Sequence, residues 1–223
     1  MATYTGLIFN AMSTDYYPRL AAVNSDNYKC MDIINQQLLI AILLLAPLLA
    51  ICALYSPLIV PILYSNDFLS ITNYMVLASL GMMFKIVSWC IAFVFIAKSE
   101  AKLFVISELF ISIFNLICNI VGYKLYGLTG LGLSFAFGYL IYMLQVYMIA
   151  HVKYRYIILK TCLGTYSILL CFIILTIAIS FMLDGILKYI LGTLVIILVS
   201  LYSYNKLNNL LNLKQYLVNR LKR

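Results

Sequence analysis

The stretch that decides the fold is LLIAILLLAPLLAICALYSPLIVPILY, which runs from Leu38 to Tyr64. It contains no charged residue. About 20 consecutive apolar residues are enough for an α-helix to cross the ~30 Å hydrocarbon core of a bilayer. A run of this length and composition is typical of a membrane span, and it is too long for the core helix of a small soluble domain.

Five further runs of the same kind follow this one. Across the chain 65% of residues are hydrophobic and 10% are charged, whereas soluble domains carry roughly 25% charged residues. The runs also lack the alternation of a membrane β-barrel. The sequence therefore predicts an all-α membrane protein with about six transmembrane helices in one bundle. The further predicted spans are Asn73–Ala97, Leu103–Tyr123, Leu128–Ala150, Leu159–Met182 and Ile186–Tyr204.

The positive residues predict the orientation of these spans, because Lys and Arg in short loops stay on the cytoplasmic side. Only Lys124 and Lys188 fall on one side of the predicted membrane. The sequence thus predicts a multi-pass protein with both ends in the cytoplasm. The opposite side holds Arg19, Lys29, Lys98, Lys102, Lys153, Arg155, Lys160, Lys206, Lys214, Arg220, Lys222 and Arg223.

Composition also excludes several classes of function. The formal charge of +8 sits in short loops, where topology and anionic lipid headgroups account for it, so we expect membrane lipids and no nucleic acid as partners. The six cysteines are scattered singly without CxxC or Cys/His spacing, so neither a disulfide framework nor a metal site is indicated. We expect no cofactor.

The chain divides into three predicted parts. Residues 1–37 read as the end of a truncated membrane helix followed by a polar cytoplasmic segment, which indicates a fragment. Residues 38–204 form the transmembrane bundle, and residues 205–223 form a basic amphipathic tail at the cytoplasmic interface. After residue 37 every loop is too short to hold a soluble catalytic domain, so we expect a transporter and not an enzyme.

Three of the predicted spans carry a stripe of polar or small residues at steps of three and four, which places each stripe on one helix face. These faces can converge on a common interior, or they can serve helix packing. We favour packing for the Gly and Ser positions and function for Lys85 and Glu108, because charges inside a membrane are costly. The stripes are Ala78, Gly81, Lys85, Ser88 and Ala92; Glu108, Ser112, Asn115 and Asn119; and Ser134, Gly138, Tyr142 and Gln145.

The depth of the two charges follows from their distance to the loop between the second and third spans. Lys85 lies ~20 Å from Lys98 and Glu108 ~9 Å from Lys102 at ~1.5 Å per residue. Side chains lean toward the amino end of their own helix, so these two charges diverge and a direct salt bridge is disfavoured. Lys85 then needs another counter-charge, either an anionic substrate or a carboxylate elsewhere.

Several segments together resemble the carboxy-terminal portion of bacterial polysaccharide flippases. These are the O-antigen and lipid-linked oligosaccharide transporters of the multidrug/oligosaccharidyl-lipid/polysaccharide exporter superfamily. The resemblance covers residues 1 to about 155. The segments are YYPRL at Tyr16–Leu20, PLIVPILYSNDF at Pro57–Phe68, FKIVSW at Phe84–Trp89, Ala97–Lys102 with Glu108, and GLTGLG at Gly127–Gly132.

The resemblance implies one bundle, or half, of a two-bundle exporter fold that opens alternately to either side. It implies flipping of an undecaprenyl-pyrophosphate-linked oligosaccharide across the bacterial inner membrane, for the biosynthesis of cell-surface polysaccharide such as the O-antigen of lipopolysaccharide. The implied partners are this substrate, a missing N-terminal helical bundle, and a polysaccharide polymerase with chain-length machinery.

Five residues are therefore candidates for substrate binding. Lys85 is a point charge suited to pyrophosphate or to acidic groups of the glycan. We expect Glu108, Asn115 and Gln145 to contact sugars or to carry a coupling proton. Arg19 either steers the lipid headgroup at the cytoplasmic mouth or serves as a positive anchor beside neighbouring aspartates.

Three alternatives remain open from the sequence. A drug or cation exporter of the same superfamily would place carboxylates against a cationic substrate, and Glu108 is the only candidate of that kind. A membrane glycan polymerase or acyltransferase would need a large outside loop, which is absent from this sequence. An inactive remnant of a split gene is the third.

Overall fold

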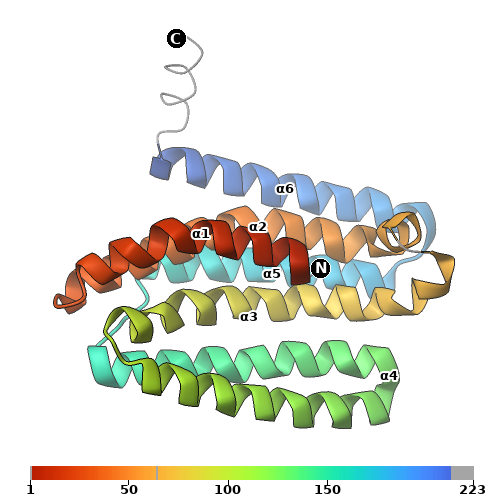
Figure 1. Cartoon of the computed structure of the whole chain (residues 1–223). Coiled ribbons are helices and arrows are strands. Elements are labelled where there is room, and N and C mark those ends of the chain that lie inside the picture. The colour runs from red at the N-terminus through yellow and green to blue at the C-terminus, as the bar shows by residue number, and fades with distance from the viewer. Residues whose placement is uncertain (1, 64, 212–223) are drawn as a thin grey trace.

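The structure is a bundle of helices (Figure 1). The computed structural model describes residues 2–63 and 65–211, and within these ranges it contains helices and no strand. Five helices are long and apolar enough to cross a membrane in this part of the chain. The prediction of an all-α membrane protein is thus confirmed. The elements are α1 (Ala2–Ala22), α2 (Asn27–Leu63), the 3-10 helix η1 (Asn66–Ile71), α3 (Thr72–Ala97), α4 (Ala101–Tyr154), α5 (Lys160–Met182) and α6 (Gly185–Leu211).

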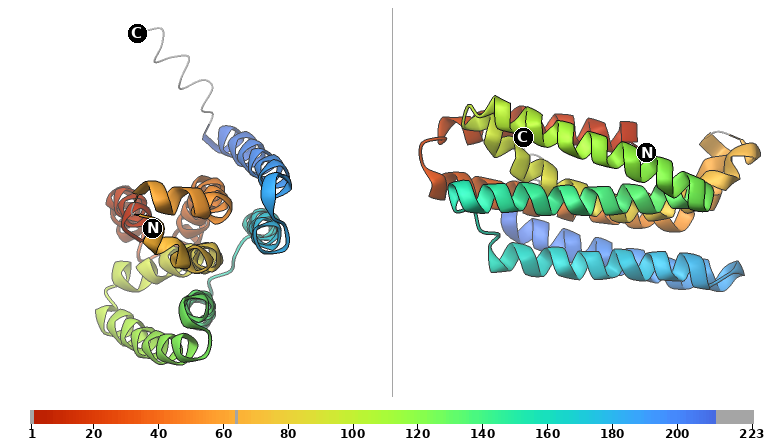
Figure 2. Two further views of the ribbon diagram at one scale, coloured as in Figure 1. Left: turned by 90° about the vertical axis from the view of Figure 1, so that its right-hand side faces the viewer. Right: turned by 90° about the horizontal axis from the view of Figure 1, so that it is seen from below.

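Helix α4 folds back on itself at Tyr126 and Gly127. The backbone leaves the helical region at both residues, and Gly127 has φ 59° and ψ −137°, a conformation open mainly to glycine. Two antiparallel arms result (Figure 2). We call residues 101–125 the first arm and residues 128–154 the second arm. With this hairpin, the five long helices account for the six predicted spans.

Helix α2 begins at Asn27, well before the apolar run at Leu38. The Asp26 carboxylate accepts the backbone N–H groups of Tyr28 (3.0 Å) and Lys29 (3.2 Å), and such a bond satisfies the first turn of a helix. The bond from the Lys29 N–H is the main cause that lowers the pKa of the Asp26 carboxyl. The polar stretch at residues 13–37 therefore consists of the end of α1, a short turn and the first turns of α2.

Helices α2 and α3 form the centre of the bundle. Helix α2 packs against α1, α3, α5 and α6, whereas α3 packs most extensively against α4. The side chains of Ile42 and Leu45 on α2, and of Met83 and Ile86 on α3, are completely buried. These two central helices therefore supply most of the core, and the outer helices cover it.

The first arm of α4 faces outward. Most of its exposed side chains are apolar, and the large apolar ones are each at least half exposed. Such a continuous apolar surface is unusual on a soluble monomer, and it matches a helix whose outer side contacts lipid. The exposed side chains include Val105, Ile106, Leu109, Phe110, Ile113, Leu116 and Ile117.

Residues 155–159 connect α4 to α5, and the buried Asn35 of α2 holds this connector in place. The Asn35 amide nitrogen donates to the carbonyl oxygen of Ile157 (3.1 Å), and its amide oxygen accepts the N–H of Leu159 (3.0 Å). Buried polar groups need such partners. The start of α5 is thereby tied to α2.

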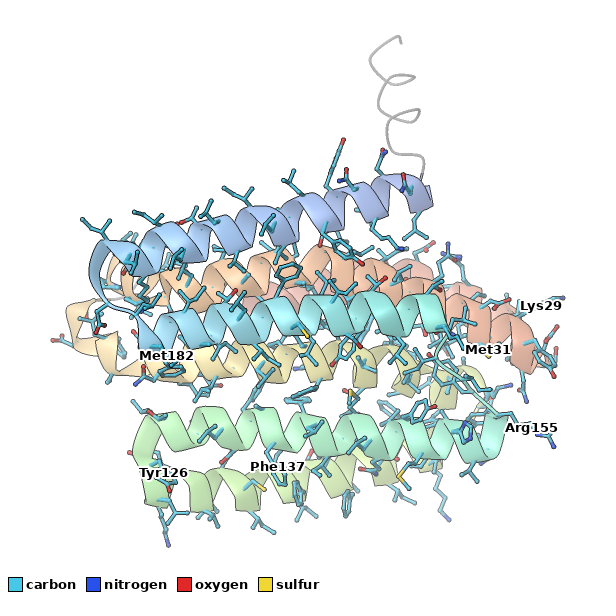
Figure 3. The ribbon with its side chains drawn as sticks, turned by 180° about the vertical axis from the view of Figure 1, so that it is seen from behind. Lys29, Met31, Tyr126, Phe137, Arg155 and Met182 are labelled. Carbon is cyan, nitrogen blue, oxygen red and sulfur yellow. The ribbon has the colours of Figure 1, made fainter. Side chains whose placement is uncertain are left out.

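Positive side chains gather at one end of the bundle, which we call the basic end. Figure 3 places Lys29 and Arg155 at this end, and Tyr126 and Met182 at the opposite one. The separation of charge along the sequence thus becomes a separation between the two ends of the molecule. Which of these ends faces the cytoplasm stays a prediction.

The predicted division at residue 204 falls inside a helix. Helix α6 continues from Gly185 through residue 204 to Leu211. Residues 212–223 of the predicted amphipathic tail lie outside the described residues, so the role of that tail stays a prediction.

The close approach of the two arms of α4 predicts a loss of stability in Gly130→Ala. A Cβ atom at Gly130 would lie 1.9 Å from the carbonyl oxygen of Gly122, and overpacking of this kind typically costs about 1–3 kcal/mol. The melting temperature in detergent, followed by intrinsic fluorescence, should fall. Gly164→Ala is the matched control, because a Cβ there meets nothing within 4 Å. Equal melting of Gly130→Ala and the wild-type chain would contradict this packing.

Candidate functional site

The two arms of α4 meet along a seam of polar and small residues. The Ser134 hydroxyl of the second arm donates to the carbonyl oxygen of Cys118 on the first arm (2.7 Å). Beside it the glycines at 122 and 130 bring the two backbones close together. The polar faces predicted for these two spans therefore do meet, and they meet directly as a helix–helix interface.

Glu108 lies in this seam on the side of the basic end. The hydroxyl of the buried Tyr142 donates to its Oε1 atom, and the Glu108 side chain is half-buried. A hydrogen bond to a charged group contributes about 1.5–3 kcal/mol, so Tyr142 offsets much of the cost of a carboxylate inside the membrane. The carboxylate is thus held by a phenol of the facing arm.

Three amide oxygens near the seam are buried without a hydrogen-bond partner within the described residues. They belong to Asn115, Asn119 and Gln145. The Asn115 oxygen lies where Gly138 leaves room for it, since a Cβ at Gly138 would be 1.6 Å away. An unpaired buried acceptor costs about 1–3 kcal/mol. These acceptors would gain from any hydrogen-bond donor that reaches them.

Lys85 of α3 reaches toward the second arm from another side. Its Nζ atom lies over the ring of Tyr139, 5.0 Å from the centroid, and the side chain is half-buried. A cation–π contact contributes about 0.5–2 kcal/mol, whereas a lysine at the centre of a spanning helix costs about 2.5–3.5 kcal/mol. The ring offsets only part of that cost, so an anion here would be stabilising.

The structure brings four of the five predicted site residues to one arm. Lys85 and Glu108 contact tyrosines one helical turn apart, Tyr139 and Tyr142. Gln145 lies one turn further along. The two charged side chains thus have different partners. This agrees with the expectation that they point toward opposite sides of the membrane. Their common neighbourhood is the middle of the second arm, which Asn115 reaches from the first arm.

Arg19 lies apart from these four residues. It is exposed on α1, where its guanidinium donates to Asp15 (3.2 Å) and to the amide oxygen of Gln36 (3.0 Å). Exposed pairs of this kind contribute about 0–1 kcal/mol. The contact with Asp15 agrees with the anchor interpretation of Arg19.

Sequence reasoning missed Tyr139 as a site residue. Its position four residues after Phe135 and three before Tyr142 puts it on an aromatic helix face, and this signal was available. Its contact with Lys85 depends on how α3 and α4 are aligned, which spacing alone does not give. Gly81 packs directly against Phe135, so packing accounts for this small residue of the α3 stripe.

No group of three His, Cys, Asp or Glu side chains suited to a metal ion occurs in residues 2–63 and 65–211. The functional groups of the candidate site are one ammonium group, one carboxylate, amides and phenols. These groups bind polar and anionic ligands by charge and hydrogen bonding.

The contact between Glu108 and Tyr142 predicts a coupling energy between the two residues. We expect Tyr142→Phe and Glu108→Ala to show non-additive losses of stability, with an interaction of about 1.5–3 kcal/mol. Denaturant unfolding in detergent of the single and double variants would measure it. Tyr126→Phe combined with Glu108→Ala is the control, because Tyr126 lies at the hairpin turn. Additive losses for Tyr142 and Glu108 would show that the contact contributes nothing.

Comparison with known proteins gives one match. A family model described as lipid II flippase MurJ matches residues 1–200. No curated protein and no solved structure matches the chain. The family match supports a flippase of a lipid-linked precursor within the exporter superfamily, and it does not single out the O-antigen branch. Because the match covers most of its length, this chain belongs to the lipid II flippase MurJ family.

Proposed function

We propose that this chain forms one wall of a path along which a polyprenyl-pyrophosphate-linked glycan crosses the membrane. The chain is a multi-pass membrane protein of a flippase family, and it is not an enzyme. The observation that carries the proposal is Lys85, a half-buried ammonium inside a spanning helix with an aromatic ring beside it. A pyrophosphate group would supply the counter-charge that Tyr139 does not.

The other groups around the second arm fit the glycan part of such a substrate. The unpaired amide oxygens of Asn115 and Gln145 can accept hydrogen bonds from sugar hydroxyls. Glu108 either contacts a sugar or carries a coupling proton, and Tyr142 would hold its carboxylate in place for both roles. Arg19 is proposed to steer the lipid headgroup at the basic end, although its present contacts also suit an anchor.

The shared chemistry of the candidate substrates is a pyrophosphate between a long isoprenoid and a polar glycan. Lipid II and an O-antigen oligosaccharide lipid both have it, and they differ in the glycan. The family match favours lipid II, and the resemblance of segments favours the polysaccharide branch. We propose that the chain lies in a bacterial inner membrane with its basic end in the cytoplasm, and that a second helical bundle forms the other wall of the path. A polysaccharide polymerase with chain-length machinery would act next on an O-antigen substrate.

A drug or cation exporter is disfavoured by the same geometry. A cationic substrate needs a carboxylate that is free to meet it, whereas Glu108 is already bonded to Tyr142. Neither Lys85 nor Glu108 belongs to an ion pair in the described residues, but Glu108 accepts a hydrogen bond from Tyr142, whereas Lys85 meets the face of an aromatic ring. An anionic substrate therefore fits better.

Lys85→Ala should lower glycan export in the strain that encodes this chain. Loss of one charge-assisted contact of about 1.5–3 kcal/mol predicts a loss of about ten- to a hundredfold in transport. Lys85→Arg should retain part of the activity, because it keeps the charge. Lys102→Ala, an exposed cation at the basic end, is the matched control. Unchanged export by Lys85→Ala at normal protein levels would refute the role of Lys85.

Depletion of the protein should identify the substrate. The precursor that it flips should accumulate on its polyprenyl carrier, and mass spectrometry of extracted lipids would show whether this is lipid II or an oligosaccharide of a surface polysaccharide. As the control, expression of the wild-type gene should remove the accumulated precursor, and expression of the Lys85→Ala variant should not. If no polyprenyl-linked glycan accumulates, the proposed function is wrong.

A further inference from the structure

A second candidate ligand site lies on the other side of the second arm. There α5 runs beside this arm (Figure 3), and a cavity of about 120 Å³ lies between them. For scale, a cavity of about 150 Å³ lined by aliphatic side chains admits a benzene molecule. The lining residues are Leu38, Val87, Met143, Leu144, Tyr147, Ile158, Leu163 and Tyr166.

This cavity is a crevice with a buried floor and exposed walls. Leu38 of α2 and Val87 of α3 form the floor and are 1% and 2% exposed. Leu144 on the second arm and Leu163 on α5 are 45% and 49% exposed. In a membrane these outer walls face lipid, so a hydrocarbon chain can enter from the side.

The end of the crevice at the connector is positively charged. Lys160 begins α5 one turn before Leu163, and His151 stacks on Tyr147 of the opposite wall (5.9 Å between ring centroids). Arg155 lies in the connector between them, where it is exposed. Within residues 2–63 and 65–211 neither Arg155 nor Lys160 belongs to an ion pair, whereas Lys153 is paired with Glu100.

We infer that this crevice binds an anionic phospholipid of the surrounding bilayer. A segment of one acyl chain lies in the crevice between α5 and the second arm, and the phosphate group meets Arg155 and Lys160. The dimensions agree, because Leu144 is ~16 Å along the helix from Arg155 at ~1.5 Å per residue, about half of the ~30 Å hydrocarbon core. Basic pockets between spanning helices bind anionic headgroups in this way.

The lipid site is distinct from the proposed transport path. Leu144, Tyr147 and His151 follow one another at steps of three and four, and so do Gly138, Tyr142 and Gln145, so the two sets occupy different faces of the same arm. A lipid in the crevice would fasten the hairpin of α4 to α5. Its removal should therefore change stability without removing any group from the polar seam.

Native mass spectrometry of the purified full chain tests this inference. We expect the wild-type chain to retain added phosphatidylglycerol in preference to phosphatidylcholine. The double variant Arg155→Gln/Lys160→Gln should bind phosphatidylglycerol at least about tenfold more weakly, since each cation near anionic lipid contributes ~1 kcal/mol. Lys29→Gln/Lys102→Gln removes two charges from the same end of the bundle and should bind like the wild-type chain.

A second variant separates headgroup binding from chain binding. Leu163→Trp fills the crevice and keeps both cations, and it should also lose the retained phosphatidylglycerol. Circular dichroism confirms that each variant is folded. The inference is overturned if Arg155→Gln/Lys160→Gln binds like the wild-type chain, or if Lys29→Gln/Lys102→Gln loses as much. Displacement of phosphatidylglycerol by inorganic phosphate, or by a polyprenyl phosphate at equal concentration, would likewise overturn it. A negative result leaves the Lys85 transport experiment unaffected.

Discussion

The scarcity of hydrogen-bond partners inside a bilayer is the constraint on which this structure depends. Backbone groups meet it by forming helices in every long apolar segment that the structure describes. Side chains meet it across interfaces, as the Tyr142 phenol does for Glu108 and the Ser134 hydroxyl does within the hairpin. Asn115 has no hydrogen-bond partner and Lys85 has no ionic partner in the described residues. The free-energy cost of burying these polar groups is therefore not fully offset, and a polar ligand that paired with them would be stabilised.

The same constraint explains what the sequence could predict. Hydropathy located the six spans because a long apolar run such as 38–64 is compatible with few structures other than a membrane-spanning helix. It placed the start of α2 too late, because the helix begins at a cap formed by Asp26, a polar feature that hydropathy does not register. The hairpin turn at Gly127 was anticipated only as a gap between two spans, since its positive φ is a property of the backbone.

The polar residues of the candidate site could be picked out from the sequence, whereas their contacts could not. Polar residues inside membrane spans are costly, so they are easily recognised in the sequence. Those singled out here are Lys85, Glu108, Asn115 and Gln145. Their partners depend on which faces of α3 and α4 meet. A stripe at helical spacing defines one face of a helix but not the helix that packs against it. The Lys85–Tyr139 contact is therefore visible only in the structure. Arg19 stood out for its charge alone, and its exposed position shows how little charge says about depth.

The connector between α4 and α5 shows how a single amide can limit what evolution may substitute. At position 35 the nitrogen serves a carbonyl group and the oxygen serves an N–H group of the same short segment. Aspartate offers acceptors without a donor, and leucine offers neither. Few side chains other than an amide of this length can satisfy both ends at once. Among related chains that keep this connector, position 35 should therefore vary far less than the apolar residues around it.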